Sequence, residues 1–347
     1  MRNANSQLNR RVVYSSHFVP AELLAAHGLL PHRLFSATRA TPLLAGANEG
    51  LCPYATAFVK EAGEFLAVGE AVIVTTTCDQ MRRAAEFLGA QSGNVFLMNV
   101  PATWQTATAQ RMYRDELARL SRFLVRFGGV QPEDARLAEI METYEQQRTA
   151  LRAGREKMKA REFAEAVIAL HQSESSADVG LPAQNTYDAS GPMVARSTQS
   201  PPRIRLALVG GPLPREHFQL YELLEESGAR IVLDATETGE RTLPAPFDRA
   251  HLQSKPLEEL ARAYFQIPDA FHRPDTELHL WLKRELAARK AQCVLFFHHN
   301  WCDLWHAELQ RLKETFSMPV IELEPNGADG QSPRTLSRIQ ALLEMFA

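Results

Sequence analysis

The chain has 347 residues and a net charge of −3. This length predicts about two domains at roughly 150 residues each, with a core large enough to need no disulfide or metal staples. The nearly balanced charge excludes a strongly basic surface for nucleic acid or an anionic membrane. The N-terminus lacks the apolar core of a secretory signal, and no apolar run approaches the roughly 18 residues of a membrane span. Four well-separated cysteines argue against a disulfide framework, so we expect a cytoplasmic protein.

Strands and helices alternate in the first third of the chain. Buried strands are predicted at 11–16, 71–77 and 95–100, with an extended segment at 31–38. Helices are predicted to begin at Pro20, Pro53 and Asp79, the first of them ending near Gly28. Alternation of this kind predicts a parallel sheet with helices on its faces. We therefore assign residues 1–105 to an N-terminal α/β lobe.

The middle of the chain has a different composition. Residues 106–171 are rich in Arg, Glu, Ala and Leu and predict a helical spacer packed on one or both sheets, broken near 127–134. Pro132, followed by two acidic residues, is a good helix start. Residues 172–202 are rich in Ser, Pro, Gly and Asn with little hydrophobic period, which predicts a flexible linker.

The alternation of strands and helices resumes in residues 203–347, which we assign to a C-terminal α/β lobe. Strands are predicted at 203–210, 230–235, 293–299 and 319–324. Helices are predicted at 215–228, 255–265, 276–290, 303–316 and 332–346. The fold class predicted is therefore α/β, with two parallel-sheet lobes and a helical segment between them.

Three of the cysteines lie at predicted helix starts. Cys52 precedes a proline, while Cys78 and Cys302 each follow a buried strand and precede an aspartate. The free N–H groups and the dipole of a helix start favour thiolate over thiol. Ligands of open α/β sheets bind at the carboxyl ends of strands, so two facing lobes would bring the three sulfurs around one cleft. Three thiolates suit a [4Fe–4S] cubane with one iron open to substrate.

Other interpretations of these residues remain. A buried cysteine is often only a core residue, and Cys293, inside a strand, is expected to be one. Zinc would ordinarily need a close Cys-x2-Cys pair, which is absent from the sequence. His298, His299 or His306 would have to complete such a site, so we rank zinc below iron–sulfur.

Candidate catalytic residues follow two of the strands. Ser16 and His17 end the first strand and would point into the same cleft, where they would polarise a thioester or transfer a proton. The simpler role for Ser16 is a helix cap, which we favour. His299 lies in the turn before Cys302 and would hydrogen-bond a substrate carbonyl or shuttle protons, unless the turn is only polar surface. The glycine turn at 210–211 matches neither a dinucleotide fingerprint nor a P-loop.

Several segments together resemble the 2-hydroxyacyl-CoA dehydratase and benzoyl-CoA reductase family, the type of its cluster-bearing subunits. They are YSSHFVPAELLAAHGLLPHRLF, the helix start at Cys52, TTTCDQMRRAAEF, LMNVPATW, RIRLALVGGPLP, EESGARIVLDATETGER, HHNWCDLW and the C-terminal VIELEPNGADGQSPRTLSRIQALLEMF. Each motif alone is loose, but their order and spacing cover nearly the whole chain except the linker.

The resemblance implies two Rossmann-like lobes, a helical domain and one [4Fe–4S] cluster held by Cys52, Cys78 and Cys302. It implies an acyl-CoA substrate, a related second subunit or a homodimer, and a separate ATP-hydrolysing iron–sulfur activator that supplies one low-potential electron. In a dehydratase, a lyase of anaerobic metabolism, the thioester becomes a ketyl radical that loses water. The alternatives are a benzoyl-CoA-reductase-type subunit and an accessory electron-transfer or scaffold protein of the same fold.

Overall fold

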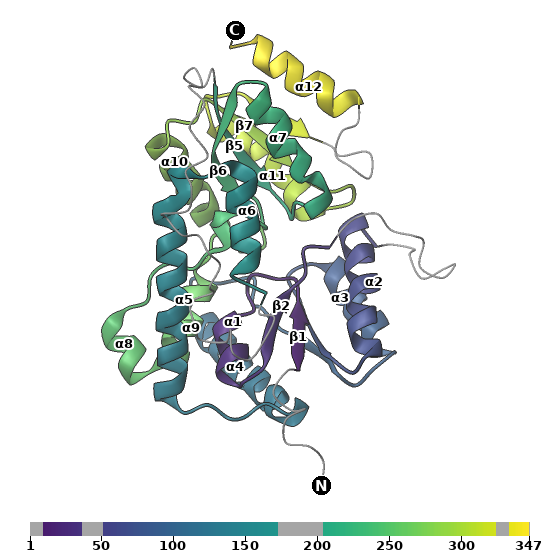
Figure 1. Cartoon of the computed structure of the whole chain (residues 1–347), viewed down its shortest axis with the longest axis vertical. Helices are drawn as coiled ribbons and strands as arrows, with labels where there is room; N and C mark the ends of the chain where they lie inside the picture. The colour runs from purple at the N-terminus through teal and green to yellow at the C-terminus, as the bar shows by residue number, and fades with distance from the viewer. Residues whose placement is uncertain (1–9, 37–50, 173–203, 324–332, 347) are drawn as a thin grey trace, which may run out of the picture.

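The computed structural model describes residues 10–36, 51–172, 204–323 and 333–346. They form two α/β lobes stacked along the long axis, with a layer of helices running beside both (Figure 1). The predicted fold class is thereby confirmed. The predicted linker at 172–202 lies, apart from its first residue, outside the described residues.

The N-terminal lobe is a parallel sheet of four strands in the order β2-β1-β3-β4. The strands are β1 (Arg11–Tyr14), β2 (Leu30–Arg33), β3 (Ala71–Thr75) and β4 (Val95–Met98). Helices α2 (Pro53–Ala67) and α3 (Asp79–Gly89) bury their apolar faces against one side of this sheet. Helices α1 (Ala21–Ala26) and α4 (Ala107–Phe127) cover the other side. Both faces are therefore buried, which explains the nearly uninterrupted apolar sequence of β1 and β3.

The C-terminal lobe repeats this arrangement in the order β6-β5-β7-β8, again all parallel. Its strands are β5 (Ile204–Gly210), β6 (Ala229–Ala235), β7 (Cys293–Phe297) and β8 (Val320–Leu323). One face packs on α6 (Ala160–Ala169), α7 (Gln219–Glu226) and α12 (Pro333–Glu344). The other face packs on α10 (Thr276–Ala288) and α11 (Asp303–Thr315). The two sheets thus share one connectivity, in which the third strand of each leads into a cysteine.

The helical layer joins the two lobes. Helix α5 (Asp134–Gly154) packs on α1 of the N-terminal lobe, and its C-terminal end reaches the other lobe (Figure 1). Two helices from the second half, α8 (Arg249–Ser254) and α9 (Pro256–Phe265), pack against α4 and α5. Helix α8 was not predicted, because it has only six residues. Its start depends on the Asp248 side chain, which accepts the His251 N–H. The division into 1–105, 106–171, 172–202 and 203–347 stays a prediction.

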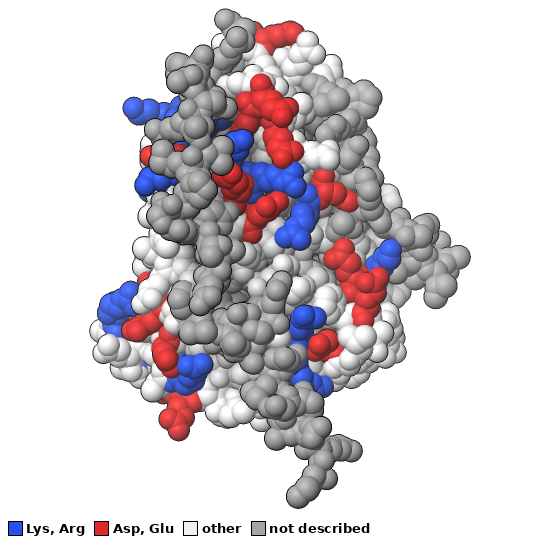
Figure 2. Space-filling model, viewed as in Figure 1, with Lys and Arg blue, Asp and Glu red and all other residues white. Residues whose placement is uncertain are grey.

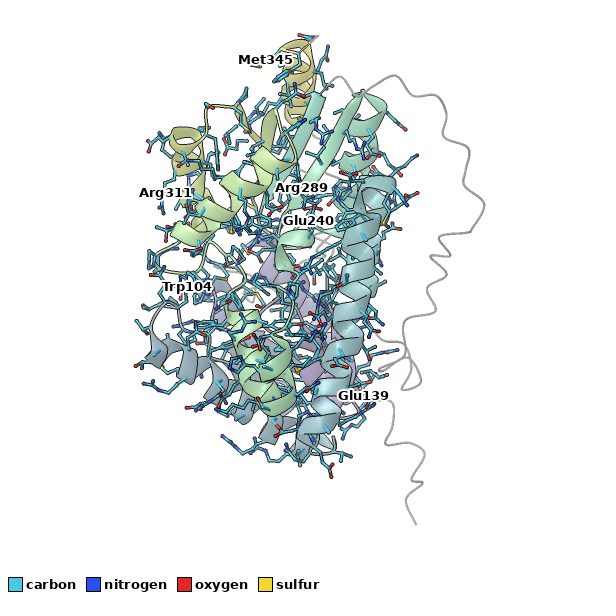
Figure 3. All side chains as sticks on the ribbon, turned by 90° about the vertical axis from the view of Figure 1, so that its left-hand side faces the viewer. Trp104, Glu139, Glu240, Arg289, Arg311 and Met345 are labelled. Carbon is cyan, nitrogen blue, oxygen red and sulfur yellow. The ribbon has the colours of Figure 1, made fainter. Side chains whose placement is uncertain are left out.

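Buried ion pairs join α5 to both lobes. Glu22 of α1 is fully buried and accepts hydrogen bonds from Arg148 of α5 and Tyr264 of α9. Just beyond the C-terminal end of α5, Arg155 lies 3.4 Å from Glu240 of the C-terminal lobe. Glu240 also pairs with Arg289 at 2.8 Å, and Figure 3 shows these two residues beside the upper part of the layer. Charges of this kind stay buried only when paired, so they fix the position of α5 relative to both lobes.

The surface visible in Figure 2 intersperses acidic and basic side chains without a large patch of one sign. This agrees with the small net charge of the sequence. Among the described residues, no helix combines the length and apolar character that crossing a membrane requires.

Candidate active site between the lobes

All three predicted cysteines are the N-terminal caps of helices. Cys52 precedes α2, Cys78 links β3 to α3, and Cys302 begins α11 after β7. The sulfurs of Cys52 and Cys78 each accept a first-turn N–H at 3.4 Å. The backbone N–H of Cys52 in turn donates to the Gln80 side chain at 2.6 Å. The first turns of α2 and α3 are therefore tied together, which holds two sulfurs at the carboxyl end of the first sheet.

The structure brings the three thiols into one region. Burial is the largest cause of a raised pKa at each, and it raises that of Cys78 to about 12. The negative charges of Cys52 and Cys78 also raise the pKa of Cys302, and that of Cys52 raises the pKa of Cys78. Such interactions weaken with distance and are screened beyond about 10 Å, so sulfurs from both lobes face one region.

One expectation about these sulfurs was wrong. We predicted that the helix starts would favour thiolate over thiol. The N–H groups do lower the pKa of Cys52 and Cys78, but burial outweighs them and the net shift is upward. The free chain therefore carries three protonated thiols at neutral pH, and a bound cation is needed to hold them as thiolates.

Cys293 behaves as the sequence predicted. It is fully buried inside β7, in the core between the sheet and its helices. Its sulfur contacts the carbonyl of the next residue at 3.6 Å, and burial raises its pKa to about 12. It is a core residue separate from the group of three.

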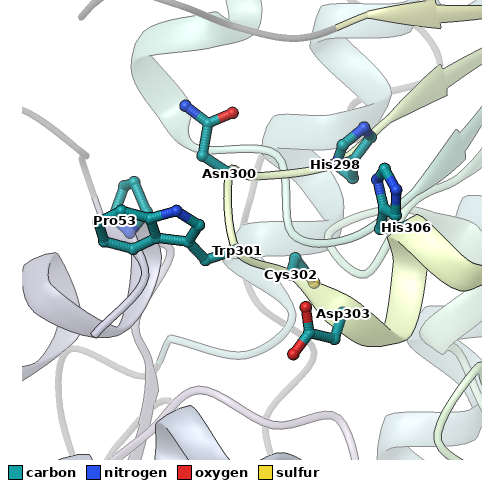
Figure 4. A pocket seen from close by; sticks show the side chains of 7 residues that line it. All are labelled: Pro53, His298, Asn300, Trp301, Cys302, Asp303 and His306. Atoms are coloured by element: carbon teal, nitrogen blue, oxygen red, sulfur yellow. The ribbon is translucent and has the colours of Figure 1, made fainter. Parts of the chain in front are cut away.

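Solvent reaches the site through a pocket of about 440 Å³. It is lined by Pro53, His298, Asn300, Trp301, Cys302, Asp303 and His306, seen from close by in Figure 4. One of these residues begins α2 of the N-terminal lobe and the rest precede or begin α11, so the pocket lies between the lobes. Trp301 is 68% exposed and has a φ of +64°, an uncommon conformation for a large side chain.

His299 faces the same junction from the C-terminal lobe. Its Nε2 contacts the Pro212 carbonyl at 2.8 Å, and because a carbonyl only accepts, Nε2 carries the ring proton. The ring stacks on Tyr54, which lies two residues after Cys52, with centroids 5.7 Å apart. Burial lowers the pKa of His299 to about 4, so the imidazole is neutral at pH 7 and can accept a hydrogen bond at Nδ1.

Ser16 and His17 occupy the turn between β1 and α1. Ser16 Oγ accepts the Phe18 N–H at 3.2 Å, while Pro20 is the N-cap of α1. Ser16 therefore caps this turn and not the helix, which corrects the cap role that we favoured. His17 is buried with its Nε2 3.4 Å from Asp269, and burial holds its pKa well below the ordinary value. Their catalytic roles stay predictions.

Sequence reasoning missed Glu237, which follows β6. Its carboxylate accepts the Trp305 indole N–H at 2.6 Å, and its charge acts on all three thiols. Burial is the main cause that raises its pKa to about 7, helped by the negative charge of Asp269. Its backbone carbonyl also accepts from Arg33 of the other lobe at 2.7 Å. The available signal was its place at the carboxyl end of a buried strand.

The fold and this site define a two-lobed parallel α/β protein that gathers three thiols at helix starts where its lobes meet. The family model described as "2-hydroxyglutaryl-CoA dehydratase, D-component" matches residues 16–346, nearly the whole chain, and the chain belongs to this family. The family resemblance seen in the sequence is thereby confirmed. The match identifies the chain as a component of the 2-hydroxyacyl-CoA dehydratase type. A search of curated proteins found no match.

Proposed function

We propose that this chain is the iron–sulfur subunit of a radical 2-hydroxyacyl-CoA dehydratase that removes water from its substrate. The observation that carries the proposal is the meeting of Cys52, Cys78 and Cys302, each at a helix start, in a chain of this family. The family description names a dehydratase component, which favours this function over a benzoyl-CoA-reductase-type subunit or an accessory electron-transfer protein.

The donor set fits a [4Fe–4S] cluster with one open iron. Three sulfurs are available, and the fourth cysteine, Cys293, is enclosed in the core of β7. Because burial raises the pKa of all three thiols, cluster binding has to displace their protons. When bound, the cluster would supply one low-potential electron and a Lewis-acidic iron for a thioester carbonyl.

The surrounding residues suit binding and proton handling. The pocket leads from solvent to Cys302, and Trp301 forms part of its wall, so a small acyl group has a route to this side of the site. His299 is neutral at pH 7 and held by Pro212, which suits it to accept a hydrogen bond from substrate. We assign Ser16 and His17 secondary roles in orienting substrate and moving protons.

The proposal includes partners. A component implies at least one further component, and we propose a related subunit, as a heterodimer or homodimer, with an ATP-dependent iron–sulfur activator that delivers the electron. The sequence lacks a P-loop motif, which agrees with ATP hydrolysis on another chain. We propose that the assembly works in the cytoplasm on an acyl-CoA.

Iron and acid-labile sulfide content of anaerobically purified protein tests the proposal, together with an EPR spectrum after dithionite reduction. We expect about four irons and four sulfides per chain. Cys302→Ala should lose or convert the cluster, whereas Cys293→Ala, the matched control, should keep it. Chains that stay free of iron after reconstitution, or a Cys302→Ala variant with unchanged iron, would contradict the assignment.

A further inference from the structure

Two imidazoles and a carboxylate meet on the C-terminal lobe, apart from the three thiols. His298 follows β7, His306 lies on α11 and Glu322 lies on β8. Their nearest ligand atoms all fall within 4.8 Å of one another. Both imidazoles line the pocket, and Figure 4 shows their rings close together on its right-hand side. The proposed cluster does not use any of the three.

The hydrogen bonds of His298 leave a lone pair directed at the centre of this group. Its Nδ1 lies 3.2 Å from the carbonyl of His299, which can only accept, so Nδ1 carries the proton of a neutral ring. Its Nε2 then faces Glu322 Oε1 at 2.9 Å with a lone pair on each atom. A second ring proton or a metal ion can bridge two such acceptors. A backbone carbonyl holding the far nitrogen is typical of a metal-binding histidine.

The carboxylate of Glu322 is oriented from behind. Arg338 of α12 lies 4.0 Å from Oε2, the oxygen that does not face His298, and donates to the Glu322 backbone carbonyl. This leaves Oε1 on the side of the two imidazoles. The third donor, His306, is the reason for preferring a metal to a simple ion pair, because a histidine–glutamate pair needs no second imidazole.

A second group of similar composition shows the contrast. Asp275, His279 and Glu308 also bring their ligand atoms within 4.8 Å. There, however, His279 bonds Glu308 at 2.8 Å and the Arg311 guanidinium pairs with Asp275 while lying 3.8 Å from Glu308. The guanidinium supplies the positive charge that a metal would bring, and this group joins α10 to α11 structurally.

We propose that His298, His306 and Glu322 form a second metal site, which binds a first-row divalent cation such as Fe²⁺ or Zn²⁺. Two imidazoles and one carboxylate are a donor set for such ions and leave coordination positions open. Because His298 and His306 line the pocket, an ion held there presents its open positions to whatever enters. The metal ion would bind an oxygen atom of a molecule in the pocket. This proposal does not depend on the assignment of the iron–sulfur cluster.

Anaerobic titration of Co²⁺ into the full-length chain, followed by visible absorption, tests this site. Cobalt reports its ligands, because thiolate ligation adds intense sulfur-to-metal charge transfer in the near ultraviolet that imidazole and carboxylate do not. We expect one tightly bound equivalent with ligand-field bands and without that charge transfer. His306→Ala and Glu322→Gln should each weaken binding at least about tenfold.

His306 is exposed on α11, so its replacement leaves the core intact, which circular dichroism will verify. His251→Ala is the matched control, since this exposed histidine lies on α8 far from the pocket. It should bind cobalt as the unchanged chain does. Equal binding by His306→Ala, charge transfer from thiolate in the bound equivalent, or no binding at all would each overturn the proposal.

Discussion

The two lobes share one strand order but place different side chains at equivalent positions. The third strand of each leads into a helix-capping cysteine, Cys78 after β3 and Cys302 after β7. The helix before that strand starts with Cys52 in the N-terminal lobe and with Asp275 in the other. One scaffold therefore supplies two sulfurs from one lobe and a single sulfur from its partner.

The surroundings of the equivalent cysteines differ as well. Cys78 follows three threonines, and the buried hydroxyl of one of them has a structural role: Thr76 Oγ1 accepts the Val100 N–H at 3.0 Å. Cys302 follows two histidines, an asparagine and an exposed tryptophan, and of these His298, Asn300 and Trp301 line the pocket. The comparison teaches that the N-terminal lobe supplies two of the three thiols, while the C-terminal lobe supplies the third and most of the pocket wall.

Gly210→Ala should have the largest effect on folding. Gly210 ends β5 with φ of +147°, and a Cβ there would lie 1.8 Å from the Phe297 carbonyl of β7. The backbones must separate to fit it, which should cost about 3 kcal/mol or more of unfolding free energy. The N-terminal lobe has Tyr14 at the corresponding strand end. The close approach of the β5 and β7 backbones at Gly210 is therefore a feature of the C-terminal lobe, which supplies most of the pocket.

Urea unfolding followed by circular dichroism measures the loss. Gly89→Ala is the matched control, because a Cβ on this helical glycine meets nothing within 4 Å. It should leave stability unchanged or raise it by about 0.5–1 kcal/mol. If Gly210→Ala unfolded with the same midpoint as the unchanged chain, the tight contact between β5 and β7 would be wrong.

Arg148→Met should cost nearly as much, in the part of the helical layer that packs on the N-terminal lobe. Arg148 pairs with Glu22, and both side chains are almost completely buried. Removing one partner leaves an unpaired buried carboxylate, which typically costs about 3–5 kcal/mol. Arg136→Met, which breaks an exposed pair with Glu139, should cost at most about 1 kcal/mol. Equal midpoints for both variants in urea would contradict a buried pair.

His272 makes the contact between the lobes sensitive to acid. Burial lowers its pKa to about 4, and its ring stacks on Trp104 at 5.3 Å. Between that pKa and the unfolded value near 6.5, the unfolded chain binds more protons, so stability rises with pH across this window and is lost as the pH falls. Above pH 6.5 the neutral His272 no longer lowers the stability of the folded chain, and the free energy of unfolding lost on full protonation below the folded pKa is about 3 kcal/mol.

His272→Phe should remove this acid-dependent loss while keeping an aromatic ring between Trp104 and its neighbours. The measurement is the difference in urea midpoint between pH 7.5 and pH 4.5, which should shrink in the variant. His251→Phe, at an exposed position, is the control and should keep the difference of the unchanged chain. An unchanged difference in His272→Phe would show that other groups carry the acid sensitivity.

The sequence was sufficient for most of the elements and for placing three thiols at helix starts, but not for α8 or for the contacts between lobes. Strand periodicity and helix starts placed Cys52, Cys78 and Cys302 correctly, since local patterns determine them. Glu237 and the reversal of the expected thiol pKa depend on burial by the other lobe, which no local pattern encodes. Distant segments packed together decide burial, and burial decides which charges persist.

Trp301→Gly should have the smallest effect on stability. It tests the difference between the residues that precede the two capping cysteines. Trp301, before Cys302, has a φ of +64°. Thr77, the equivalent residue before Cys78, is not one of the described residues with a positive φ. Glycine relieves roughly 1 kcal/mol of backbone strain, and an exposed side chain loses little packing. Trp301→Ala keeps the strain, so Trp301→Gly should unfold at a higher urea concentration than Trp301→Ala. The opposite order would mean that the positive φ of this turn does not destabilise the chain.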